Sequence, residues 1–166
     1  MLQKQALTVF GENIKKYRER EGKTRKDFAK EIGYHRLDLA KLEYGEKDIK
    51  INTAIKIAKR INLSLPRLFS ETEFQKYLEI ASKERMGFVD DDYMKIYIAR
   101  LKEYTGTRGM QSNISIKAGM DPSNVSKLLN YQIKNPCIST LDTLARCVGQ
   151  DLSMLISRTN DLRVEE

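Results

Sequence analysis

The stretch KAGMDPSNVSKLLN, residues 117–130, combines a turn with the beginning of a short helix. Asp121 stands directly before Pro122, and this pair is a strong helix start. The carboxylate accepts hydrogen bonds from free backbone N–H groups, and proline fits the first turn without losing a bond. A second stretch, EIGYHRLDLAKLEYG at residues 31–45, has the same outline. The sequence therefore predicts two short helices, each entered abruptly after a turn.

The similarity extends beyond these two stretches, because apolar residues recur at an offset of 86 or 87 positions. The matched sets are Phe10, Ile14 and Tyr17 with Tyr97, Leu101 and Tyr104; Phe28 and Ile32 with Ile114 and Ala118; Leu39 and Leu42 with Val125 and Leu128; and Leu65, Leu68 and Phe69 with Leu152, Leu155 and Ile156. The offset changes only in loops, where insertions are tolerated. Each half is expected to form five short helices spaced by the helical period.

Local signals mark where several of these helices begin and end. Thr24 with Asp27, and Ser139 with Asp142, form variants of the capping box that starts a helix. Gly33 and Gly119 suit turns that need a positive φ. No segment shows the strict alternation of a β-strand. The predicted fold class is therefore all-α.

Charge divides the chain, whose net charge is +7, into four parts. Residues 1–69 hold 17 Lys/Arg against 9 Asp/Glu, residues 70–93 hold 3 against 7, residues 94–157 hold 8 against 4, and residues 158–166 hold 2 against 3. Solvated surfaces would account for this pattern, but it also fits two domains that face a polyanion, separated by an acidic spacer. We expect two domains at 1–69 and 94–157, a linker at 70–93 and a polar tail at 158–166.

The linker is expected to be partly helical. Helix-forming residues dominate from Glu71 to Arg85, with an apolar stripe at Phe74, Tyr77, Leu78 and Ala81. The run Asp90-Asp91-Asp92 that follows resembles a divalent-cation site. We expect it instead to cap the next helix and to complement the positive N-terminus of that helix.

The composition argues against several classes of protein. One His and two cysteines, Cys137 and Cys147, make neither a disulfide framework nor a zinc site, and we expect no metal and no cofactor. The sequence shows no catalytic Ser/His/Asp or Cys/His set and no phosphate-binding Gly-rich loop, so we expect no enzyme. No apolar run approaches the roughly 20 residues that span a bilayer. The N-terminus MLQKQALTVF lacks the features of a signal peptide, so we expect a cytoplasmic protein that does not contact a membrane.

A helix, a tight turn and a short helix within a basic five-helix unit form the helix-turn-helix layout. The first unit resembles the phage-repressor family, of the Cro/cI or XRE type. The matching segments are IKKYRERE (14–21), TRKDFAKEIGYHRLDLAKLEYGE (24–46) and IKIAKRINLSLPRLF (55–69). The second unit resembles a diverged member through GMDPSNVSKLLN (119–130) and ISTLDTLARCVGQDLSMLI (138–156). The resemblance implies two lambda-repressor-like five-helix domains.

The same resemblance implies a structural ion pair. A first-helix arginine in this family commonly pairs with a glutamate near the end of the recognition helix, and Arg18 and Glu43 occupy those positions. Two solvated charges are the alternative. The corresponding residues of the second unit are Thr105 and Leu129, so both partners have changed together.

In helix-turn-helix proteins the second helix lies in the major groove, where its first residues meet base edges. Residues expected to read bases in the first unit are Arg36, Leu37, Asp38 and Lys41. Residues expected to contact phosphates there are Arg25, Lys47 and Lys50. Leu37 suits a thymine methyl group or a protein interface, and Asp38 suits either cytosine N4 or a bond that holds Arg36.

The second unit departs from this pattern because Pro122 stands at the first base-reading position. Readout there would shift to Ser123, Asn124 and Lys127, while Gln111 takes the position of Arg25. This unit is less basic, so it is either a second DNA reader or an interaction domain that keeps the shape.

The predicted function is a sequence-specific, double-stranded-DNA-binding transcriptional regulator of bacterial, plasmid or phage type, a repressor rather than an activator. One chain would read two unlike half-sites, or two chains would form a homodimer. The resemblance implies dimerisation through the last helix of a unit, so exposed faces around residues 65–69 and 152–156 are the candidate dimerisation surfaces. The alternative is a protein-binding module, such as an antitoxin, antirepressor or inhibitor.

Overall fold

In the computed structural model, residues 4–80, 87–106 and 108–158 are described. These described residues form eleven helices and no β-strand, which confirms the all-α fold class. The first unit comprises α1 (Ala6–Arg20), α2 (Arg25–Ile32), α3 (Arg36–Glu43), α4 (Ile51–Arg60) and α5 (Leu65–Leu68). The linker contains α6 (Glu71–Glu79). The second unit comprises α7 (Tyr93–Tyr104), α8 (Arg108–Ala118), α9 (Pro122–Leu129), α10 (Ile138–Cys147) and α11 (Leu152–Leu155).

Several helices begin where the local sequence signals place them. The Thr24 hydroxyl oxygen accepts from the backbone N–H of Asp27 at 3.2 Å, which confirms the predicted start of α2. The Asp121 carboxylate accepts from Ser123 N at 2.7 Å, with Pro122 in the first turn of α9. Both starts are satisfied within three residues of sequence, which is why the sequence alone reveals them.

Two glycines end helices with the predicted geometry. Gly33 has φ +67° at the C-terminus of α2, and Gly119 has φ +64° after α8. A left-handed residue at this point lets the chain leave one helix and approach the next, and glycine adopts it without a steric penalty.

The expected capping box of Ser139 and Asp142 is wrong. Helix α10 begins after Cys137, so Ser139 lies within its first turn. The backbone N–H and the hydroxyl of Ser139 both donate to the Asp48 carboxylate of the first unit. Asp142 is buried and accepts from Ala6 N at 3.0 Å. The two side chains therefore serve contacts between units, which a local pattern does not encode.

The linker packs on the first unit. Ser70 caps α6 by accepting from Glu73 N at 3.2 Å, and Phe74 and Tyr77 are buried. The predicted stripe position Ala81 lies outside the described residues. Before α7, the Asp92 carboxylate accepts from Lys95 N at 3.0 Å, which confirms the predicted capping role for the last residue of this acidic run.

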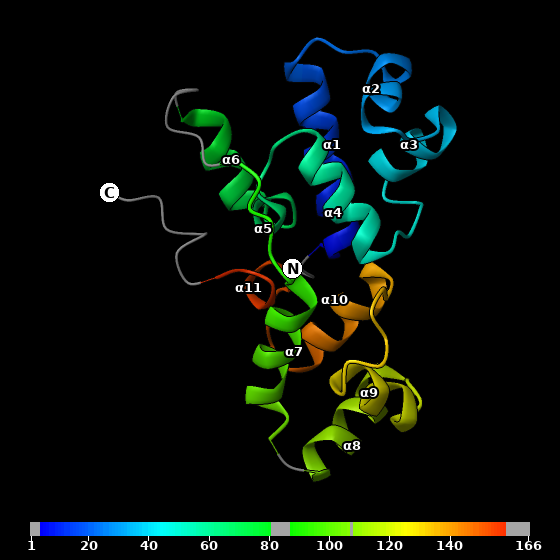
Figure 1. Ribbon diagram of the computed structural model, residues 1–166, viewed down its shortest axis with the longest axis vertical. Coiled ribbons are helices and arrows are strands. Elements are labelled where there is room, and N and C mark those ends of the chain that lie inside the picture. Colours follow the sequence, from blue (N-terminus) through cyan, green and yellow to red (C-terminus); the bar gives the residue numbers. More distant parts are fainter. Residues whose placement is uncertain (1–3, 81–86, 107, 159–166) are drawn as a thin grey trace.

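The two units lie one above the other along the long axis of the molecule, and α5 packs against α11 between them (Figure 1). Residues 65–69 and 152–156 were expected to form exposed dimerisation faces. This expectation is wrong for all of them except Met154, because the others are buried. The apolar side chains of one segment cover those of the other, so the chain buries both faces within itself.

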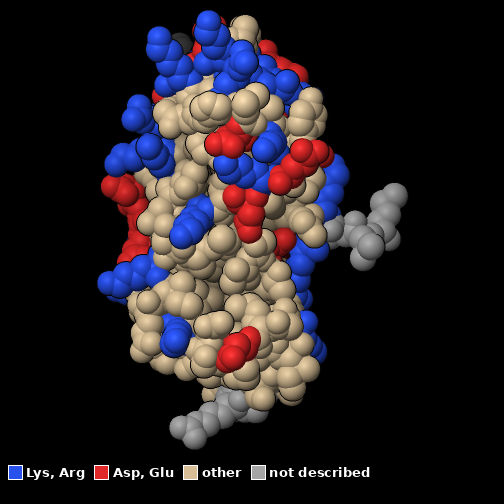
Figure 2. Space-filling view, turned by 90° about the vertical axis from the view of Figure 1, so that its right-hand side faces the viewer, with Lys and Arg blue, Asp and Glu red and all other residues tan. Residues whose placement is uncertain are grey.

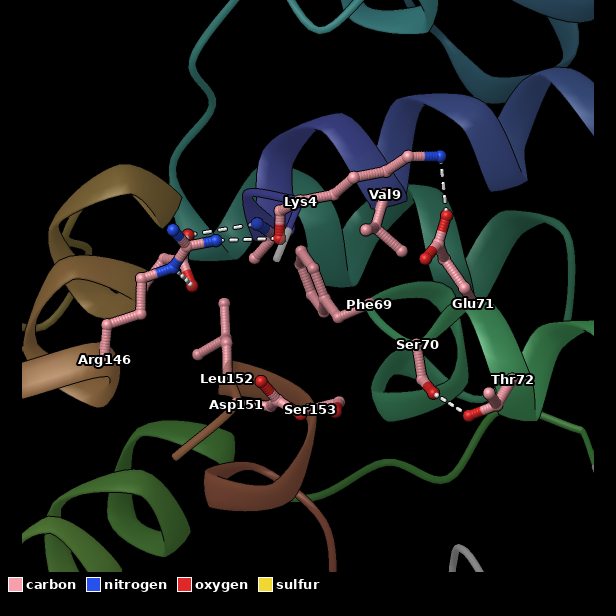
Figure 3. A pocket seen from close by; sticks show the side chains of 12 residues that line it. Lys4, Val9, Phe69, Ser70, Glu71, Thr72, Arg146, Asp151, Leu152 and Ser153 are labelled. Atoms are coloured by element: carbon pink, nitrogen blue, oxygen red, sulfur yellow. Dashed lines mark hydrogen bonds and ion pairs between the residues drawn. The ribbon is translucent and has the colours of Figure 1, made fainter. Parts of the chain in front are cut away.

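A cavity of about 230 Å³ lies where the N-terminal part of the chain meets the second unit (Figure 3). Its wall includes Lys4 and Phe69 on one side and Arg146 and Leu152 on the other. Arg146 donates to the backbone carbonyl of Lys4 at 2.7 Å. Lys4 also forms an ion pair with Glu71 at 2.7 Å. No helix in the described part of the chain has the length and apolar character needed to cross a membrane.

The Thr24 cap gives a direct test of the first unit's local stability. We expect Thr24→Ala to lower the free energy of unfolding by about 1 kcal/mol, because an orphan N–H of α2 loses its acceptor. Urea denaturation followed by circular dichroism measures this change. Thr24→Ser retains the acceptor oxygen and should lose much less, and equal losses in the two variants would contradict a capping role.

Candidate nucleic-acid interface

The buried face of α3 fixes which of its residues point outward. Leu39 and Leu42 are fully buried in the core of the first unit. Arg36 and Lys41 are exposed, and the side chain of Leu37 is 60% exposed. Helix α3 therefore presents two cationic side chains and one large exposed apolar side chain, Leu37.

A buried carboxylate holds the end of α3 against the first two helices. Glu43 is 3% exposed and accepts from Arg18 Nε at 2.6 Å and from Arg18 Nη2 at 3.2 Å. Its second oxygen also accepts from Arg25 Nε at 2.7 Å. Glu43 thus joins α1, α2 and α3 through one side chain.

Arg25, the expected phosphate contact, is anchored by these bonds at the edge of the surface. Its guanidinium also donates to the Tyr44 hydroxyl at 3.2 Å and lies 5.2 Å from the centre of that ring. The hydrogen bond to Glu43 raises the pKa of Arg25, so its positive charge is secure. Tyr44 is 59% exposed, and Lys15 lies on its ring as well, 5.8 Å from the centre. Tyr44 was not among the residues predicted from the sequence, although an aromatic residue among basic ones was the available signal.

Asp38 and Lys47 hold each other across the turn that follows α3. Their ion pair measures 2.7 Å, and the hydrogen bond from Lys47 lowers the pKa of the Asp38 carboxyl group. Lys47 also lies 5.7 Å from the ring centre of Tyr34. The suggestion that Asp38 holds Arg36 is therefore wrong, because its partner is Lys47. Lys50 is exposed immediately before α4.

The second unit presents a shorter set of polar groups. Val125 and Leu128 anchor α9 in the core, while Ser123, Asn124 and Lys127 are exposed. Gln111 lies half-buried on α8, and its backbone carbonyl accepts from the Ser115 hydroxyl at 2.9 Å.

The buried charge cluster of the first unit is replaced in the second. Thr105 and Leu129, at the positions that match Arg18 and Glu43, are both buried. The Thr105 hydroxyl has no hydrogen-bond partner among the described residues. Leu129 fills its position with apolar packing, so α9 is held without an ion pair.

Helices α3 and α9 lie on the same side of the molecule, on the right in Figure 1. Figure 2 views this side directly and shows Lys and Arg gathered over the upper part, which the first unit forms. The lower part, which the second unit forms, is mostly uncharged on this face. The interface is therefore electrostatically unequal, with most of its charged side chains on the first unit.

Residues 14–68 match a family model described as helix-turn-helix. The matched segment runs from within α1 to the end of α5, so it covers the first unit and ends before α6. It supports the family resemblance of the first unit and suggests a DNA-binding regulator of transcription. Comparisons with curated proteins and with solved structures found no match.

Proposed function

We propose that the chain is a sequence-specific, non-enzymatic regulator of transcription that inserts α3 into the major groove of double-stranded DNA. The observation that carries this proposal is the outward presentation of Arg36, Leu37 and Lys41 on a short helix within the matched segment. The regulator is of bacterial, plasmid or phage type and acts in the cytoplasm. It represses transcription if, once bound, it blocks other proteins from the same DNA.

The exposed side chains of α3 fit the chemistry of base edges. Arg36 and Lys41 donate to guanine O6 and N7, and Leu37 contacts a thymine methyl group. Arg25, Lys47 and the exposed Lys50 lie around this helix and contact phosphates, which positions the protein without reading sequence. Arg25 and Lys47 each have acidic partners in the chain, so they share their donors between these partners and the DNA.

We propose that the second unit is a diverged copy that contacts DNA through α9. Asn124 is exposed and can form a bidentate pair with adenine N6 and N7, while Ser123 and Lys127 supply further polar contacts. Gln111 replaces a cation with an amide at the edge of this surface. Fewer charges on this unit predict a weaker electrostatic contribution than that of the first unit.

Substitution of Lys41 tests the proposed readout. We expect Lys41→Ala to reduce discrimination at one base position by about 1–3 kcal/mol, because its donor is lost from the base edge. The measurement is equilibrium binding to operator variants selected from a random oligonucleotide pool, repeated across a salt titration. Affinity should fall steeply as salt rises.

Lys76→Ala is the matched control, because Lys76 is an exposed lysine on α6, away from the interface. It should leave base preference unchanged. Equal weakening of all sequences by Lys41→Ala would assign Lys41 to phosphate contact instead.

A protein-binding module is the second candidate, and the 60% exposure of Leu37 favours it. A large exposed apolar side chain suits a protein pocket as well as a thymine methyl group. The absence of any sequence preference at low salt would support this candidate over the DNA reader.

A further inference from the structure

The contact between the two units has the form of a two-fold symmetric interface. Its centre is an isolated antiparallel bridge between Lys50 and Cys137. The hydrogen bonds of this bridge run from Ile51 N to Pro136 O at 2.9 Å and from Ile138 N to Ile49 O at 2.8 Å. Cys137 follows Lys50 by 87 positions, which is the offset of the internal repeat. Equivalent residues of the two units therefore face each other across the bridge.

Side chains on either side of the bridge repeat this reciprocity. Asp48 Oδ1 accepts from the backbone N–H of Ser139 at 3.2 Å, in the first turn of α10. Asn135 Oδ1 accepts from the backbone N–H of Asn52 at 3.0 Å, in the first turn of α4. Asn135 follows Asp48 by 87 positions, and Ser139 follows Asn52 by the same number. Each unit thus caps the helix of the other with the equivalent side chain.

The apolar part of the interface obeys the same rule. Helix α5 packs against α11, and these helices are equivalent at the offset of 87. Leu65 and Leu68 on one side, and Leu152 and Leu155 on the other, are each at most 2% exposed. In an interface of this kind the same patch is used by both partners, as in a C2 homodimer. Here one chain supplies both patches, so a second copy of the chain finds them already covered.

We infer that one chain acts as a covalently joined dimer and binds, as a monomer, a DNA site made of two unlike half-sites in inverted orientation. This inference rests on the proposed function. A two-fold axis between the units relates α3 to α9, and both helices lie on the same side of the molecule (Figure 1). The contact between the two units fixes the separation of α3 and α9, so it also fixes the spacing of the half-sites that one molecule can occupy.

The two half-sites differ because the exposed residues of α3 and α9 differ. Helix α3 presents Arg36 and Lys41, which suit guanine, whereas α9 presents Asn124, which suits adenine. A homodimer of identical readers requires a palindrome, but this chain is free to recognise an asymmetric sequence. The half-site under α3 supplies most of the electrostatic attraction, as the charge distribution in Figure 2 indicates.

The experiment uses the full chain and a duplex selected by it from a random pool. Analytical ultracentrifugation should find one chain per duplex. Footprinting of the same duplex should find two protected segments centred about 34 Å apart, one turn of the DNA helix. Lys41→Ala should relax base preference in one segment only. Asn124→Ala should relax it in the other only and weaken binding about tenfold. Gln75→Ala, an exposed amide on α6, is the control and should change neither.

A variant of the same duplex with altered half-site spacing tests whether the contact between the units holds α3 and α9 at a fixed separation. Insertion of about 5 base pairs turns one half-site to the opposite face of DNA, so affinity should fall to that of a single half-site. The inference would be overturned if two chains bound one palindromic duplex and if neither Asn124→Ala nor the insertion changed the contacts of each chain. DNA binding by α3 would remain intact in that case. A chain with no sequence preference would instead refute the proposed function, and the inference with it.

Discussion

Glu43→Leu is expected to lower the free energy of unfolding by about 3–5 kcal/mol, because it removes one partner of a buried ion pair. The Arg18 side chain is only 10% exposed and has its Nε and Nη2 on the Glu43 carboxylate. Without Glu43, the Arg18 guanidinium retains its bond to the Lys23 carbonyl at 2.9 Å but no buried counter-charge. Arg25 loses the same carboxylate, but its side chain is 32% exposed and can be solvated.

The second unit suggests the compensating change. Thr105 and Leu129 stand there in place of the charged pair, and both are buried. We therefore expect the double variant Arg18→Thr with Glu43→Leu to be more stable than Glu43→Leu alone, because no buried charge is left unpaired. Urea denaturation of both single variants and the double variant yields the coupling energy. Additive losses would show that the ion pair contributes no coupling and would contradict this account.

Features set by neighbouring residues were predictable from the sequence. Thr24 and Asp121 cap helices through bonds to N–H groups two or three residues away, and Gly33 ends α2 through its own φ. The recurrence of apolar residues also indicated which side chains form the core, because the helical period places them on one face. These signals were sufficient for the all-α fold class.

Contacts between the units were not predictable in this way. Ser139 and Asp142 match a capping pattern, yet neither caps α10: Ser139 donates to Asp48 and Asp142 accepts from Ala6, both more than 90 positions away. From the sequence, the apolar ends of the two units resemble exposed interaction surfaces. Only the folded arrangement shows that they cover each other. A pattern that reveals an apolar face does not reveal what packs on it.

The candidate site shows the same division. The exposed positions of α3 follow from its buried ones, so Arg36 and Lys41 were accessible to sequence reasoning. The in-chain partners of Arg25 and Lys47 were not, because Glu43 and Asp38 meet them only after α2, α3 and the following turn have packed. Gly11 was not predicted from the sequence either, because its close approach to the Leu42 carbonyl depends on how α1 packs against α3.

Gly11→Ala is expected to destabilise the protein by about 1–3 kcal/mol, through overpacking against a neighbouring backbone. A Cβ atom added at Gly11 in α1 would lie 2.0 Å from the carbonyl oxygen of Leu42 in α3. In an open helix interior the same substitution would stabilise by roughly 0.5–1 kcal/mol, so the sign of the change distinguishes close approach from helix propensity. Thermal unfolding measures this sign, and Lys16→Ala, at an exposed position of α1, should be well tolerated.

The same substitution should weaken specific DNA binding, although Gly11 itself is buried beneath α3. Relief of the clash requires α3 to move away from α1, which displaces Arg36 and Lys41 together. Base contacts depend on hydrogen-bond geometry, whereas phosphate contacts tolerate small shifts. Affinity for the selected operator should therefore fall more than affinity for random DNA, as measured by competition binding at one salt concentration. A raised melting temperature with unchanged operator affinity would show that α1 and α3 do not meet at Gly11, and the placement of the recognition surface would be wrong with it.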